Sequence, residues 1–137
     1  MVTKKKPDLE LMNDKSPSVR WQVAEIIGVE HLPMMMNDKD WGVRWQVAKR
    51  IGIEHLPKMM NDKDSDIRCQ VAKRIVVEHL SKMMNDEDHR VRWQVAKRID
   101  PKFLGEMFGF DFSPEYQKGL IKILAKREDL KNFLKNE

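Results

Sequence analysis

Four arginines recur at equal intervals of 24 residues, and each follows an aspartate that lies six positions upstream. A guanidinium beside a carboxylate can bind an anionic ligand or form a structural ion pair. Because the same combination occurs in every interval, whereas an active site normally occurs once, we expect a structural role.

A helical wheel shows why these arginines need partners. With Val43 at 0° and a step of about 100° per residue, Val47, Ala48 and Ile51 form one apolar arc, and Arg44 falls inside it. A guanidinium in apolar surroundings needs an anionic partner. We therefore predict a buried arginine–aspartate ladder that joins neighbouring repeats, with the members Arg20, Arg44, Arg68, Arg92, Asp14, Asp38, Asp62 and Asp86.

Three tryptophans occupy one position of the repeat, where the third repeat carries Cys69. They share a flank of the wheel with Lys-Arg pairs, and this candidate binding flank comprises Trp21, Trp45, Trp93, Lys49, Arg50, Lys73, Arg74, Lys97 and Arg98. Indoles with basic neighbours can stack on bases and contact phosphates. The alternative is that each indole packs between repeats, and Cys69 favours this packing because a small thiol is a poor stacking platform.

Histidines also recur, as His31, His55 and His79, but their spacing argues against a metal site. Stacked helices lie about 8–10 Å apart, whereas each ligand nitrogen must lie about 2 Å from a zinc ion. The Met-Met pairs that follow have the spacing of core residues, or in a less favoured interpretation line a groove for a partner helix. The sequence has no glycine-rich phosphate loop and no isolated catalytic triad, so we expect no cofactor, no metal and no enzymatic activity.

The elements that position these residues are helices. Residues 43–51 read V-R-W-Q-V-A-K-R-I, and close copies stand at 19–27, 67–75 and 91–99. Each copy begins after a residue that can cap a helix with its side chain, namely Ser16, Asp40, Asp64 or Asp88. Gly28 and Gly52 follow the first two copies, where a left-handed residue would end the helix. The block after each glycine contains a proline, which predicts a short 3₁₀ turn.

Units of this size cannot bury both helical segments alone, so successive units must stack on one another. We predict an all-α fold, a right-handed α-solenoid of 24-residue helix/3₁₀-helix repeats. Four repeats fill residues 10–105, a basic tail and partial cap occupies residues 1–9, and a helical cap occupies residues 106–137. In that cap Ser113-Pro114 restarts a helix, with Gln117 at the position of the arginine.

The phrase D-x-D-x-x-V-R-x-x-V-A-x-R, followed by L-P-x-M-M, resembles the leucine-rich repeat variant family of HEAT-like helical repeats. The resemblance covers residues 10–105 and implies an α-helix that alternates with a 3₁₀ helix. A characterised member carries an iron–sulfur cluster on a cysteine-rich N-terminal segment. This chain has one cysteine, Cys69, so the resemblance implies no cluster here.

Composition narrows the functional classes. The chain has 137 residues, 41% of them hydrophobic and 35% charged, and no apolar run approaches the roughly 18 residues of a membrane span. We expect a cytoplasmic protein. The formal net charge is +4, but residues 10–112 carry 17 basic and 17 acidic residues. A scaffold that mediates protein–protein interaction is the leading hypothesis, nucleic-acid binding is the alternative, and an enzyme, suggested only by analogy of fold, comes third.

Overall fold

The structure is a computed structural model, and it describes residues 9–111 and 113–135. The predicted basic tail therefore lies, but for its last residue, outside the described residues. The chain divides into two compact units, Met1–Val71 and Ala72–Glu137. Elements of the first unit are the 3₁₀ helices η1 (Leu9–Asn13), η2 (Val29–Met35) and η3 (Ile53–Met59) and the α-helices α1 (Pro17–Ile26) and α2 (Trp41–Arg50). Helix α3 (Ser65–Arg74) begins in the first unit and ends in the second.

The second unit continues the alternation and then changes it. It contains η4 (Val77–Lys82), α4 (His89–Ala96), η5 (Pro101–Phe103), α5 (Leu104–Phe110), α6 (Pro114–Leu124) and α7 (Glu128–Lys135). Where the sequence predicts only a short turn after Asp100, η5 runs directly into α5. No helix among the described residues is long and apolar enough to span a membrane.

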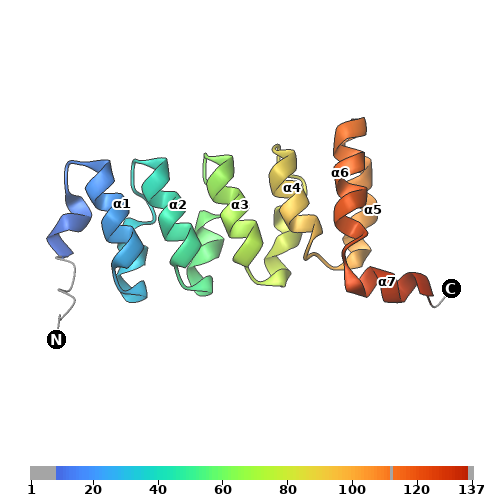
Figure 1. Cartoon of the computed structure of the whole chain (residues 1–137), viewed down its shortest axis with the longest axis horizontal. Coiled ribbons are helices and arrows are strands. Elements are labelled where there is room, and N and C mark those ends of the chain that lie inside the picture. The colour runs from blue at the N-terminus through green and yellow to red at the C-terminus, as the bar shows by residue number, and fades with distance from the viewer. Residues whose placement is uncertain (1–8, 112, 136–137) are drawn as a thin grey trace. The chain divides into compact units, whose positions relative to one another are not determined.

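The repeated phrase forms the core as its periodicity predicts. Val43, Val47, Ala48 and Ile51 are fully buried, and the residues at the same positions of α3 and α4 are buried as well. The 3₁₀ helices η2, η3 and η4 add one buried leucine each, namely Leu32, Leu56 and Leu80. Helices α1 and α2 pack side by side, each joined to the next repeat through a 3₁₀ helix (Figure 1). The described residues thus form an all-α fold of stacked helical repeats, which confirms the predicted class.

The helix starts match the sequence prediction in most repeats but not in the first. Asp40 accepts a hydrogen bond from Val43 N at 3.1 Å, and Asp88 accepts one from Arg90 N at 2.8 Å. The prediction for Ser16 is wrong, because its side chain makes no capping bond. Instead Ser16 donates its backbone N–H to Asp14 Oδ1 at 2.8 Å. Pro17 at the first helical position lacks an N–H, so this helix start has one orphan donor fewer.

The prediction that left-handed glycines end the helices is also wrong. Gly28 has φ −58° and ψ 141°, and Gly52 has φ −56° and ψ 139°. Val76 holds the same position in the third repeat with φ −59° and ψ 144°. This extended conformation is open to any residue. The chain turns directly from the α-helix into the 3₁₀ helix, so no left-handed residue is needed.

Candidate interaction surface

The arginine–aspartate pairs lie inside the repeats and hold neighbouring repeats together. Arg44 is only 5% exposed, and its Nε and Nη2 donate to the two carboxylate oxygens of Asp62 at 2.9 and 3.2 Å. Its Nη1 donates to the backbone carbonyl of Asp38 at 2.7 Å. The carboxylate therefore comes from the following repeat, while the aspartate six positions upstream contributes its main chain.

Arg20 makes the same set of contacts one repeat earlier. Its Nε lies 2.8 Å from Asp38 Oδ2, and its Nη1 donates to Asp14 O at 2.7 Å. The hydrogen-bonded Asp38 carboxylate raises the pKa of the Arg20 guanidinium, which keeps it charged at every physiological pH. Arg68, also buried, repeats the main-chain bond by donating to Asp62 O at 2.8 Å.

Arg92 is held differently, because a helical cap follows it. Its Nη2 donates to Asp111 Oδ2 at 2.8 Å, and its Nη1 donates to Asp86 O. The guanidinium carbon lies 4.9 Å from the ring centroid of Phe110 and 4.5 Å from that of Tyr116. Aromatic faces thus replace part of the carboxylate pairing around this cation. Burial raises the pKa of the Tyr116 hydroxyl, which donates to a backbone carbonyl.

The cap continues the ladder with a neutral residue, as the position of Gln117 predicts. Gln117 Nε2 donates to the backbone carbonyls of Asp111 at 2.6 Å and Phe108 at 2.7 Å. The six-residue step from Gln117 back to Asp111 equals that from each arginine back to its carbonyl. The backbone N–H of Ser113 bonds the Asp111 carboxylate and, with Arg92 nearby, holds its pKa below the ordinary value.

A second set of arginines belongs to the candidate binding flank predicted from the sequence, and the structure shows two of them, Arg50 and Arg98, bound to main chain. Arg50 donates from Nη1 to Ala24 O at 2.6 Å and from Nη2 to Ile27 O at 2.8 Å. Arg98 repeats this on Ala72 O at 2.8 Å and Ile75 O at 2.7 Å. Each guanidinium thereby satisfies carbonyls at the end of the preceding α-helix. Sequence reasoning missed this role, and the only signal for it was the recurrence of the Lys-Arg pair at the ends of the repeated phrases.

The other arginines at this position fit the same environment. Burial lowers the pKa of the Arg74 guanidinium. The Ala-Lys-Arg triplet at the end of α4 recurs at the end of α6, in the cap. The arginine of this second triplet, Arg127, donates from Nη1 to Ala96 O at 2.9 Å. In the first repeat Ile26 occupies the position and is 61% exposed. The arginines of the predicted flank are thus not directed outward as a group.

The tryptophans divide between the two interpretations. Trp93 is packed: a Cβ on Gly119 would overlap its ring, and the His89 ring lies 4.6 Å away in an edge-on arrangement. Trp21, Trp45 and Trp93 are all half-buried. Lys49 Nζ lies 5.4 Å from the Trp45 ring centroid, which is a cation–π contact.

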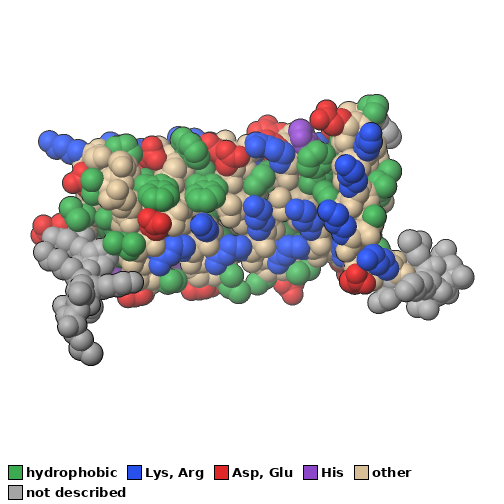
Figure 2. Space-filling view, in the orientation of Figure 1, with side chains coloured by type: hydrophobic (Ala, Val, Ile, Leu, Met, Phe, Trp, Pro, Cys, Tyr) green, Lys and Arg blue, Asp and Glu red, His purple; other side chains and the backbone are tan. Residues whose placement is uncertain are grey.

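A fourth tryptophan, Trp41, was not singled out from the sequence, although it stands one helical turn before Trp45. It is 55% exposed. The Trp21 ring reaches the start of α2, because its Cδ1 lies 3.8 Å from where a Cβ on Gly42 would be. Hydrophobic side chains gather over α1 and α2 in Figure 2. We call Trp21, Trp41 and Trp45 the tryptophan face.

The remaining candidate residues have structural or solvent-exposed positions. Lys49, Lys73 and Lys97 are exposed, whereas Met35, Met59, Met83 and Met84 are buried. His31 Nε2 and His55 Nε2 each lie 3.5 Å from the carboxylate of the preceding glutamate. Among the described residues no group of three His, Cys, Asp or Glu side chains could hold a metal ion.

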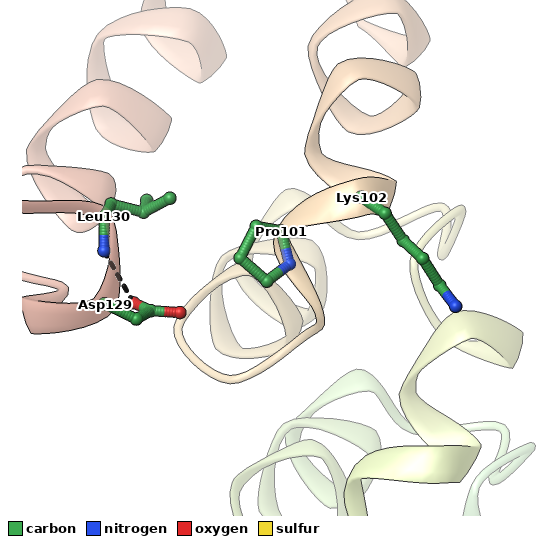
Figure 3. Close-up of a pocket in the computed structure, with 4 residues that line it drawn as sticks. All are labelled: Pro101, Lys102, Asp129 and Leu130. Carbon is green, nitrogen blue, oxygen red and sulfur yellow. Dashed lines mark hydrogen bonds between the residues drawn. The ribbon is translucent and has the colours of Figure 1, made fainter. Parts of the chain in front are cut away.

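A hollow of about 360 Å³ lies in the second unit between η5 and α7. Pro101 and Lys102 line one side, and Asp129 and Leu130 line the other (Figure 3). The Asp129 carboxylate accepts two hydrogen bonds from Arg127, at 2.6 and 3.0 Å, and these hold its pKa below the ordinary value. A carboxylate held ionised in this way is a poor general acid.

These features define a class: the chain is an α-helical repeat protein built from α/3₁₀ modules. It is similar to a solved structure described as a leucine-rich repeat variant with a novel repetitive protein structural motif, with 38% identity and a TM-score of 0.76. This confirms the predicted resemblance to the leucine-rich repeat variant. The match covers 82% of this chain and 48% of that one, so the chain spans about half its length. No family model and no curated protein matches the chain.

Proposed function

We propose that the chain is a non-catalytic scaffold that binds a protein partner through the tryptophan face. The observation that carries this proposal is Trp41, a large apolar side chain that is more than half exposed. Tryptophan is the residue type most enriched at the energetic centres of protein interfaces. The half-buried Trp21 and Trp45 beside it extend the apolar area, and contiguous exposed apolar patches mark interaction sites.

The contacts of the binding flank give the nucleic-acid alternative no comparable support. Arg50 and Arg98, which could have gripped phosphates, donate to backbone carbonyls. Trp93, which could have stacked on a base, is packed against α6 at Gly119. Single-strand binding normally combines exposed aromatic platforms with a basic groove.

The test is affinity capture from the lysate of the native host, with and without nuclease. We expect a protein retained after nuclease treatment by the wild-type chain and lost by Trp41→Ala. The matched control is Met34→Ala, which removes another exposed apolar side chain of the first unit, 66% exposed on η2. Equal retention by Trp41→Ala and the wild type would contradict the proposal, as would a partner that disappears with nuclease.

A further inference from the structure

Three helix ends in the second unit carry the same Lys-Arg pair, and the two residues of each pair behave differently. Arg98 binds the carbonyls at the end of α3, and Arg127 binds Ala96 O at the end of α4. These bonds bring the ends of α3, α4 and α6 next to one another. The lysines that precede the arginines, Lys73, Lys97 and Lys126, are all exposed.

Lys122 adds a fourth exposed ammonium, one helical turn before Lys126. We call Lys73, Lys97, Lys122 and Lys126 the lysine face. No described acidic residue pairs with these four lysines. The two carboxylates that follow Lys126 have other partners, because Asp129 binds Arg127 and Glu128 binds Lys131. Figure 2 shows Lys and Arg side chains gathered over α4 and α6.

We propose that the lysine face binds an acidic segment, rich in Glu or Asp, of a protein partner. Lys97 Nζ donates to the neutral Gln94 Oε1 at 3.3 Å, so all four ammonium groups keep their charge without an acidic partner among the described residues. Four such cations on adjacent helix ends create a positive potential that attracts a complementary negative chain. The helix dipole already favours Lys122, which lies in the last turn of α6, whereas Lys126 lies beyond the end of that helix.

The chemistry of this face favours carboxylates over nucleic acid. Its exposed cations are ammonium groups, which act as point charges, whereas the planar guanidinium groups of Arg98 and Arg127 beside them are bound to main chain. The nearest indole, Trp93, packs on Gly119 and offers no platform for a base. An acidic polypeptide needs neither bidentate phosphate contacts nor stacking.

This inference rests on the proposed function, because it specifies the chemistry of a protein partner. The experiment measures binding of a fluorescent oligoglutamate peptide to the full chain by anisotropy. We expect binding that weakens as salt rises, because exposed charges are screened within about 10 Å at 0.1 M ionic strength. The double variant Lys97→Glu/Lys126→Glu should weaken binding at least about tenfold, since it removes two attractions and adds two repulsions.

The matched control is Lys82→Glu/Lys102→Glu, which changes the net charge equally at exposed lysines on η4 and η5. It should keep most of the affinity, and both variants should keep the helical circular dichroism signal. Equal losses in both variants, or no peptide binding at low salt, would overturn the lysine face. Tighter binding of an oligothymidylate of equal charge would overturn the preference for protein.

The outcomes also separate this inference from the proposed function. If Trp41→Ala loses a captured protein but oligoglutamate fails to bind, the scaffold stands and the lysine face is wrong. If oligoglutamate binds as expected but capture returns no protein sensitive to Trp41, the tryptophan face is wrong.

Discussion

At the scale of single residues, the buried arginines illustrate how a charged group can be part of a core. Arg44 uses all three of its guanidinium nitrogens, two on Asp62 and one on the Asp38 carbonyl. Burying an ion costs free energy, and only such complete pairing compensates for it. The pair therefore gives specificity to the stacking of repeats, because the carboxylate must come from the next module.

Arg44→Ala should lower the free energy of unfolding by about 3–5 kcal/mol, because it leaves the Asp62 carboxylate nearly buried without its partner. Chemical denaturation followed by circular dichroism measures the change. Lys49→Ala in the same helix serves as the control and should cost no more than about 1 kcal/mol, the value of an exposed cation–π contact. A loss for Arg44→Ala no larger than that of Lys49→Ala would show that the ion pair contributes nothing.

At the scale of elements, two glycines show opposite consequences of added volume. Gly52 has an ordinary φ, and a Cβ there would come within 2.5 Å of the Glu54 carboxylate, which is flexible and exposed. Gly119 lies on α6 against the indole of Trp93, which is packed between α4 and α6. The Glu54 carboxylate can move into solvent, whereas the Trp93 indole is held between two helices.

Gly52→Ala should raise the free energy of unfolding by about 0.4–1 kcal/mol, because alanine restricts the unfolded chain more than glycine does. Gly119→Ala should lower it by up to about 2 kcal/mol, because overpacking costs about 1–3 kcal/mol and outweighs a helix-propensity gain of about 1 kcal/mol. Chemical denaturation of each variant beside the wild type measures the sign and size of both changes in the free energy of unfolding. A stabilised Gly119→Ala would mean that the indole moves freely.

The sequence predicted the elements well wherever a signal repeats, and less well where the repeat changes. The apolar positions of α2 and the 3₁₀ character around Pro57 follow from periodicity and proline chemistry. The backbone conformation of Gly28 does not, because glycine allows both signs of φ and only the path into η2 decides between them. The role of Arg50 was also hidden, because its acceptors are backbone carbonyls, which every sequence has.

At the scale of the whole molecule, stability depends on contacts between neighbouring modules. Arg50→Met should lower the free energy of unfolding by about 2 kcal/mol, because it removes two charged hydrogen bonds to Ala24 O and Ile27 O. It should also broaden the denaturation curve, since α1 would be less tightly coupled to α2. Lys49→Met is the matched control, and identical curves for the two variants would show that the Arg50 bonds do not couple the helices.

The arginine–aspartate bonds of the first unit run in one direction along the chain, from Arg20 to Asp38 and from Arg44 to Asp62. The aspartate of each module accepts hydrogen bonds from the arginine of the module before it. The arginine of the same module donates to the aspartate of the module that follows. A duplicated cassette of residues 29–52, spliced in after Gly52, would accept Arg44 on its own aspartate and offer its own arginine to Asp62. Length could therefore change in steps of one cassette without leaving a donor or acceptor unmatched, which makes this architecture easy for gene duplication to extend.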